Sequence, residues 1–186
     1  MEVEVNAEAK DKRLNRLVAI TVVILSVFMG LGNIKDGNIV QAMQQAKADS
    51  VDRWGEYQAT RTKLHIAETA RTEIAALAAH PTPQTQVALG DLDGKIAKYQ
   101  QETPKLAAEA KGLADQYDAL NVHDDQFDAS EALISTAISL SAVAALVESN
   151  GVLLAAWAFG VFGMFMGVCG FAGFGFHPDI LSTFLG

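Results

Sequence analysis

The sequence contains few of the residues on which reactive or nucleic-acid-binding sites depend. Its 186 residues include a single cysteine, Cys169, so no intrachain disulfide can form. No lysine or arginine follows Lys111, and the net charge is -8 at neutral pH. The middle of the chain, residues 35–131, carries ten basic and sixteen acidic residues. We expect no binding to nucleic acid, because its phosphates require a basic surface.

Charge is missing altogether from three long apolar stretches, which are Leu17–Ile34, Ala132–Val147 and Val152–Phe176. As α-helices they would be about 27, 24 and 37 Å long, against a hydrocarbon core of about 30 Å. We therefore predict transmembrane helices at 17–34, 132–148 and 151–176. A cleaved signal peptide is the alternative for the first stretch, but no small-x-small cleavage site follows Gly32 directly.

Basic residues flank only the first of these stretches. Lys10, Lys12, Arg13 and Arg16 precede it, and the end of the chain has no basic residue. The positive-inside rule therefore predicts that residues 1–16 are a cytoplasmic N-terminal segment. The middle, residues 35–131, is expected on the opposite side of the membrane, together with the C-terminal tail at 177–186.

The charged middle is predicted to form two helical arms around the break "HPTPQT", residues 80–85. Thr82 is a suitable N-cap and Pro83 a suitable first residue for the second arm. Apolar residues then recur every three or four positions, which is typical of a coiled-coil seam. The predicted seam includes Trp54 in the first arm and Leu92, Ile96, Leu106, Leu113 and Leu120 in the second.

These patterns predict an all-α membrane protein with a long antiparallel, coiled-coil-like helical hairpin between its first and second transmembrane helices. The proline break also sets the register of the two arms. Trp54 is expected near Ala110 and Leu113 as a buried residue, so that Trp54→Ala would cost about 3 kcal/mol. The other expected neighbours are Ile39 with Phe127, Met43 with Leu120, Ile74 with Leu89 and Leu92, Lys47 with Asp115 and Asp118, and Arg71 with Asp91 and Asp93.

Glycine recurs at heptad-like spacing in the last apolar stretch, at Gly160, Gly163, Gly167 and Gly170. On a helix these residues share one face, and small residues in this arrangement let membrane helices approach closely. A flexible, pore-lining helix is the alternative. The second stretch offers a matching small surface, in which we expect Ser135 and Ser139 to take part in packing.

The titratable side chains follow no pattern of a catalytic or metal site. An acidic group, Asp124, Asp125, Asp128 and Glu131, is interpreted as a capping box at Asp128 and Glu131 with a solvated helix face. An acidic collar in an oligomer is the alternative. No spacing matches a calcium loop or a zinc site. His65, His80, His123 and His177 are scattered, and we expect no catalytic site, metal or cofactor.

The segment Asp11–Ala59 carries a resemblance to a known family, above all in "NIVQAMQQAKAD" and the tryptophan that follows. It resembles the opening of an uncharacterised bacterial membrane-protein family, domain of unknown function 4337. An N-terminal anchor, a charged helical middle and two closing spans match that family along nearly the whole chain. The resemblance implies an integral membrane protein and no particular activity.

Two functional hypotheses follow. The first is a non-enzymatic scaffold in the bacterial inner (cytoplasmic) membrane that contacts lipid, self-associates as a homo-oligomer and presents the tip of a periplasmic hairpin to a protein partner. The second is a passive channel or holin-like pore formed by a homo-oligomer. A coupled transporter is disfavoured, because the predicted spans contain none of the ionisable residues that such proteins place there.

Overall fold

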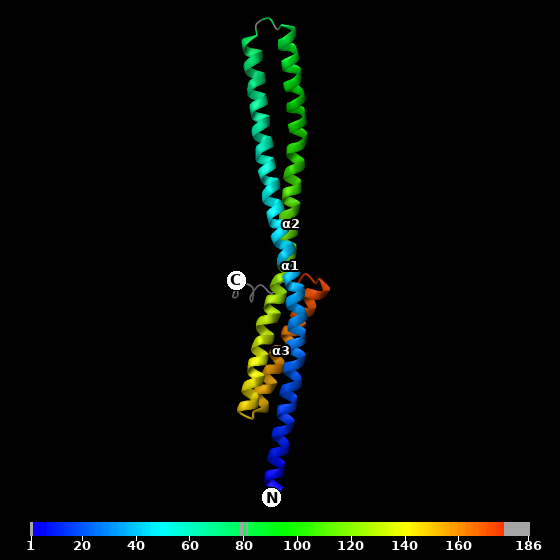
Figure 1. Cartoon of the computed structure of the whole chain (residues 1–186), viewed down its shortest axis with the longest axis vertical. Helices are drawn as coiled ribbons and strands as arrows, with labels where there is room; N and C mark the ends of the chain where they lie inside the picture. Colours follow the sequence, from blue (N-terminus) through cyan, green and yellow to red (C-terminus); the bar gives the residue numbers. More distant parts are fainter. Residues whose placement is uncertain (1, 79, 81, 177–186) are drawn as a thin grey trace. The chain divides into compact units, whose positions relative to one another are not determined.

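A computed structural model describes the backbone of residues 2–78, 80 and 82–176, and the side chains of these residues from Lys12 onward. It contains three α-helices, α1 (Glu2–Leu77), α2 (Pro83–Leu146) and α3 (Asn150–Ala172), which Figure 1 shows. The described part of the chain has no β-strand, so the expectation of an all-α protein is confirmed.

The chain divides into two compact units. One, here called the bundle, comprises Met1–Ala42 and Ala119–Gly186, and the other, here called the hairpin, comprises Met43–Asp118. Helices α1 and α2 contribute to both units, whereas α3 belongs to the bundle. The compact hairpin is therefore shorter than the extramembrane segment expected at 35–131.

The tip of the hairpin follows from local sequence. Helix α1 ends at Leu77 and α2 begins at Pro83. The backbone N–H of Thr85 donates to Oγ1 of Thr82 at 3.2 Å, which satisfies one of the free donors of the first turn. Pro83 fits the first helical position because no N–H is needed there. Helix α2 then continues through Pro104.

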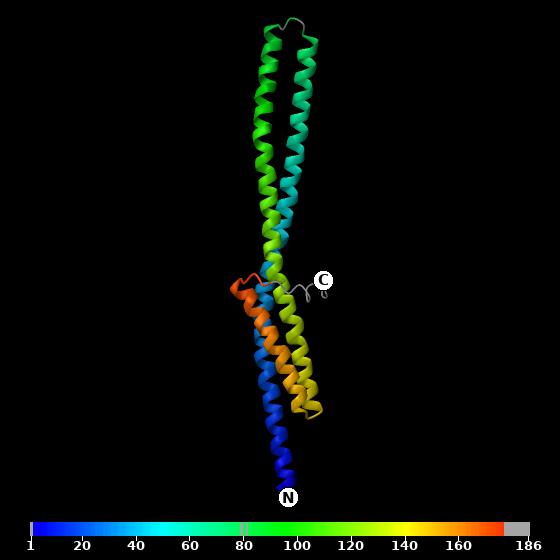
Figure 2. The ribbon, with the colours of Figure 1, turned by 180° about the vertical axis from the view of Figure 1, so that it is seen from behind.

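The two arms of the hairpin run antiparallel and side by side, as Figures 1 and 2 show. Arg71 forms an ion pair with Asp93, which is the pairing that the register predicted. The ammonium of Lys47 lies 5.2 Å from the centre of the ring of Tyr117, a residue that stands in the sequence between the expected neighbours Asp115 and Asp118. The register of the arms is thus close to the one set by the proline break.

The seam between the arms differs from the prediction in the first arm. Leu92, Ile96, Leu106, Leu113 and Leu120 of α2 are half-buried, as a seam requires. Trp54, however, is 40% exposed and packs edge-on against Tyr57, so the expectation of a buried Trp54 is wrong. The inward positions are taken by Ser50 and Thr60, and the Ser50 hydroxyl donates to the Ala110 carbonyl at 3.0 Å.

The core of the bundle consists of small groups of apolar side chains contributed by all three helices. One group joins Leu14 and Val18 of α1 to Ala144 of α2 and Leu153 of α3. Further groups are Leu25 with Ile134 and Ala137, and Ala129 with Leu133 and Met166.

Helix α3 is shorter than the predicted third span, and its two ends have clear causes. Oγ of Ser149 accepts a hydrogen bond from the N–H of Val152 at 3.5 Å and caps the beginning. Gly173 adopts a φ of 70°, a conformation that glycine reaches without strain, and ends the helix. Helix α3 therefore stops at Ala172 instead of Phe176, and α2 stops at Leu146 instead of 148.

Candidate functional site

The glycine face of α3 lies against the other two helices of the same chain. All four expected residues, Gly160, Gly163, Gly167 and Gly170, are buried. A Cβ at position 163 would lie 2.8 Å from Ile134 Cγ1, one at 167 would lie 2.6 Å from the Phe28 ring, and one at 170 would lie 2.7 Å from the Phe127 ring. Only glycine fits these three positions, so this face serves packing within the chain.

Ser135 and Ser139 of α2 lie outside this packing face. Both are exposed, and the Ser139 hydroxyl donates to the Ser135 carbonyl at 2.9 Å. Helix α2 carries small residues on two faces, and the face that contains Ala137 and Ser141, both 0% exposed, is the buried one. The expectation that Ser135 and Ser139 pack against the glycines is therefore wrong.

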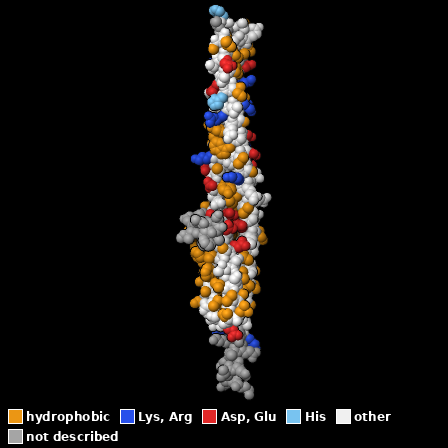
Figure 3. Space-filling view, turned by 90° about the vertical axis from the view of Figure 1, so that its left-hand side faces the viewer, with side chains coloured by type: hydrophobic (Ala, Val, Ile, Leu, Met, Phe, Trp, Pro, Cys, Tyr) orange, Lys and Arg blue, Asp and Glu red, His pale blue; other side chains and the backbone are white. Residues whose placement is uncertain are grey.

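A group of carboxyl side chains in the bundle, here called the carboxylate cluster, consists of Asp36 of α1 and the three residues of α2 whose charges act on it, Asp124, Asp128 and Glu131. Oδ1 of Asp36 is buried and has no hydrogen-bond partner. Burial raises the pKa of Asp36 to about 6, assisted by the charge of Asp124, a hydrogen bond to it and the charges of Asp128 and Glu131. Figure 3 shows acidic side chains (red) at several places on the face that it draws, a few of them close together.

The pKa values of Asp124 and Asp128 are shifted in the same direction. Burial raises the pKa of Asp124, and the charge of Asp125 adds to this, whereas the hydrogen bond from Asp36 opposes it. Burial also raises the pKa of Asp128, with the charges of its acidic neighbours. Two ionised carboxylates can only accept hydrogen bonds, so the contact between Asp36 and Asp124 becomes a hydrogen bond only when one of them carries a proton.

A buried glutamine of α2 holds the segment that follows α3. Gln126 is 0% exposed, and its Nε2 donates to the carbonyl oxygens of Phe174, at 2.8 Å, and of Phe176. Its Oε1 forms a hydrogen bond with Nδ1 of His123 at 3.2 Å. The side-chain amide thus joins α2 to the backbone of the segment that follows α3. No sequence signal pointed to this residue, because a single glutamine in a charged helix has no distinctive spacing.

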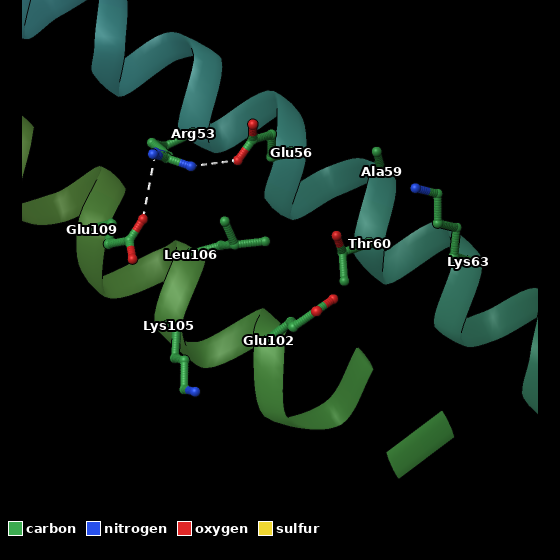
Figure 4. Close-up of a pocket in the computed structure, with 9 residues that line it drawn as sticks. All are labelled: Arg53, Glu56, Ala59, Thr60, Lys63, Glu102, Lys105, Leu106 and Glu109. Atoms are coloured by element: carbon green, nitrogen blue, oxygen red, sulfur yellow. Dashed lines mark hydrogen bonds and ion pairs between the residues drawn. The ribbon is translucent and has the colours of Figure 1, made fainter. Parts of the chain in front are cut away.

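The hairpin contains an open polar groove of about 540 Å³ between its arms, drawn in Figure 4. Arg53 bridges Glu56 of its own arm at 2.7 Å and Glu109 of the other arm at 3.3 Å. The hydrogen bond and charge of Glu56, and then the charge of Glu109, raise the pKa of Arg53. Lys63, Lys105 and Glu102 also line the groove, so its charges are balanced. Exposed ion pairs of this kind add little stability, but they disfavour other registers of the two arms.

In the part of the chain that the structure describes, no group of three or more His, Cys, Asp or Glu side chains is arranged to hold a metal ion. His65 pairs with Glu68 at 3.4 Å, whereas His177 lies outside the described residues. The interpretation of Asp128 and Glu131 as a capping box is wrong, because α2 runs from Pro83 to Leu146 without an end at this point.

The model of the family described as "Domain of unknown function (DUF4337)" matches residues 14–173. No curated protein and no solved structure matches the chain. The matched range takes in the whole hairpin, the glycine face and the carboxylate cluster. Because the family model covers most of the sequence, the chain belongs to the DUF4337 family.

Proposed function

We propose that this chain is an integral membrane protein whose bundle is the membrane anchor. One observation carries the proposal, which is that the inside of the bundle is rich in small residues while many large apolar side chains cover its outer surface. Ala137, Ala144 and Ala156 are 0% exposed, whereas Ile24 and Val161 are 53% and 63% exposed. Membrane helices pack through small residues in this way. An apolar surface of this extent would promote aggregation in water.

The length of the helices supports the same proposal. Each of α1, α2 and α3 contains a segment long and apolar enough to cross a membrane. Several polar side chains on these segments find hydrogen-bond partners within the protein, as lipid requires. The Thr136 hydroxyl donates to the Ala132 carbonyl at 2.8 Å, and the Trp157 indole N–H donates to Oγ1 of Thr21 at 2.9 Å.

Within this anchor model we propose a non-enzymatic scaffold of the bacterial inner membrane, with the hairpin on the periplasmic side. The orientation is supported by Lys12, Arg13 and Arg16 before the first span and by the absence of basic residues after Lys111. The tip is proposed to bind a protein partner. Residues 74–90 contain no Asp, Glu, Lys or Arg, and Leu77 is 87% exposed there.

Self-association is proposed to use a face other than the glycine face, because Gly163 and Gly167 already contact α1 and α2 of their own chain. The exposed side of α2 that bears Ser135 and Ser139 is the candidate. The same exposure favours a second function, a passive channel or holin-like pore lined by these hydroxyls. The Ser135 hydroxyl donates to Met29 Sδ and the Ser139 hydroxyl donates to the Ser135 carbonyl. Because both hydroxyls already have partners within the protein, they favour contact with lipid or protein over contact with water in a pore.

Fractionation tests the anchor. The chain should stay in the membrane pellet after alkaline carbonate extraction and enter solution only with detergent. Release by carbonate alone would contradict the anchor.

The molecular mass of the complex purified in detergent should then be measured to obtain its stoichiometry, and the proteins that co-purify with it should be identified. Planar bilayers decide between the two functions, because the scaffold should give no single-channel currents at any ionic strength. Steady currents that Ser139→Leu abolishes would support the pore instead.

A further inference from the structure

We propose that Asp36 of α1 and Asp124 of α2 share one proton and form a latch that fastens these two helices together in the bundle. With the proton present, Asp36 donates to the Asp124 carboxylate and the latch is closed. Without it, two carboxylates face each other and repel, and the helices loosen at this point. The inference concerns packing inside the bundle and stands apart from the proposed membrane role.

The contact between Asp36 and Asp124 lacks a hydrogen-bond donor, and the surrounding protein supplies none to the buried Oδ1 of Asp36. Asp36 and Asp124 come from different helices and lie within hydrogen-bonding range of each other. Oδ1 of Asp36 is buried and accepts no hydrogen bond from any side chain or backbone group. A buried polar atom without a partner is unfavourable, and an ionised carboxyl has no donor of its own. A proton on Asp36 turns the contact between two acceptors into a hydrogen bond.

The charges around the pair favour retention of this proton. The charged or titratable residues next to the pair along the two helices are Lys35 on α1 and His123, Asp125, Asp128 and Glu131 on α2. The charges of Asp124, Asp128 and Glu131 all act to raise the pKa of Asp36. Lys35 is exposed, and His123 is engaged with Gln126. The described residues of α3 and of the segment up to Phe176 contribute no Asp, Glu, Lys, Arg or His.

The direction of the pH dependence follows from the sign of the shift. The pKa of Asp36 is about 6 in the folded chain, against an ordinary value of 3.8. The folded bundle therefore binds the proton more tightly than the unfolded chain does. The stabilisation is complete below the ordinary pKa and is lost as the pH rises through about 6. Because the two carboxyls are linked, the observed midpoint belongs to the pair.

Infrared spectroscopy of the full chain in detergent or nanodiscs tests the latch directly. The wild type should show the carbonyl band of a protonated carboxylic acid, which disappears as the pH is raised through about 6. Asp36→Asn should lack this band. Asp118→Asn is the matched control, since it changes an exposed aspartate on α2, and it should keep the band and its midpoint.

Thermal unfolding over the same pH range gives the second readout. The wild-type melting temperature should fall as the pH rises through the midpoint. In Asp36→Asn the amide can donate to Asp124 at every pH, so the melting temperature should lose this dependence. A band that titrates near the ordinary pKa of aspartate, or a wild-type melting temperature that does not change across the range, would overturn the proposal.

Asp128→Asn keeps the proposal testable if Asp36→Asn fails to fold. It removes one neighbouring negative charge and leaves the pair intact, so the band should persist with its midpoint moved to lower pH. An unchanged or higher midpoint would contradict the assignment of the proton to this cluster.

Discussion

Gly167 of α3 lies directly against Phe28 of α1. A Cβ at position 167 would be 2.6 Å from Cε1 of Phe28 and 2.8 Å from Oγ of Ser130. Real Cβ atoms do not approach other atoms so closely, and Phe28 and Ser130 belong to two different helices. This single glycine therefore sets how near α3 can come to both α1 and α2.

Replacement of this glycine should weaken the bundle even when the new side chain is minimal. We expect Gly167→Ala to cost about 1–3 kcal/mol, because the methyl group forces its neighbours apart. Gly30→Ala is the matched control in α1, since a Cβ there meets nothing within 4 Å and should not destabilise the bundle. Reversible unfolding in mixed detergent micelles measures both. Equal effects of the two substitutions would show that the glycine face is not a close contact.

The clamp formed by Gln126 should control the segment that follows α3. Gln126→Leu leaves the carbonyl oxygens of Phe174 and Phe176 without their donor, which should cost about 1–3 kcal/mol. Hydrogen exchange should become faster at residues 174–176 and remain slow in the middle of α3. Gln116→Leu, at an exposed position of α2, should change neither. Unaltered exchange in Gln126→Leu would contradict the clamp.

The exposed position of Trp54 changes the expected effect of its removal. The side chain loses only an edge-on contact with Tyr57, at a ring distance of 5.3 Å, so Trp54→Ala should cost about 0.5–1.5 kcal/mol. Ala110, which is 0% exposed, provides the comparison, because Ala110→Leu should overpack the seam and cost more. Thermal unfolding of the full chain ranks the two. A larger loss of stability for Trp54→Ala than for Ala110→Leu would show that Trp54 is buried in the seam after all.

The contact between Ser50 and Ala110 offers a test of the hairpin register. In a Cys169→Ala background, Ser50→Cys with Ala110→Cys should oxidise to a disulfide within one chain, because the Ser50 hydroxyl reaches the Ala110 carbonyl at 3.0 Å. Ser50→Cys with Leu92→Cys is the control and should stay reduced. Cross-linked dimers without an intrachain product would show that the arms pair between chains.

Several features could be predicted from the sequence because local chemistry determines them. The beginning of α2 at Pro83 with Thr82 as its cap depends only on residues next to each other. The burial of Gly160 and Gly163 follows from helical periodicity, since small residues on one face admit a close neighbour. The pairing of Arg71 with Asp93 follows from the position of the turn alone.

Other features depend on tertiary packing, which periodicity does not decide. Helix α2 has two faces that carry small residues, one with Ala137 and one with Ser139. Which of them is buried depends on where the neighbouring helix packs, and the structure buries the face with Ala137. In the first arm, hydrophobicity favoured Trp54 for the seam, but the heptad spacing runs through the polar residues Ser50 and Thr60. Asp36 gave no signal by itself, because its shifted pKa arises only when α1 brings it beside Asp124.

The central proposal is that the apolar segments of the bundle lie in lipid and that the hairpin projects outside the cytoplasm. Single cysteines in a Cys169→Ala background test both halves of it in intact spheroplasts with a membrane-impermeant maleimide. Gln84→Cys, at the exposed start of α2, should be labelled at once, whereas Val161→Cys, on the apolar surface of α3, should react only after the protein is denatured. Labelling of Gln84→Cys only after lysis would place the hairpin in the cytoplasm, and labelling of Val161→Cys in native membranes would show that the bundle is not the anchor.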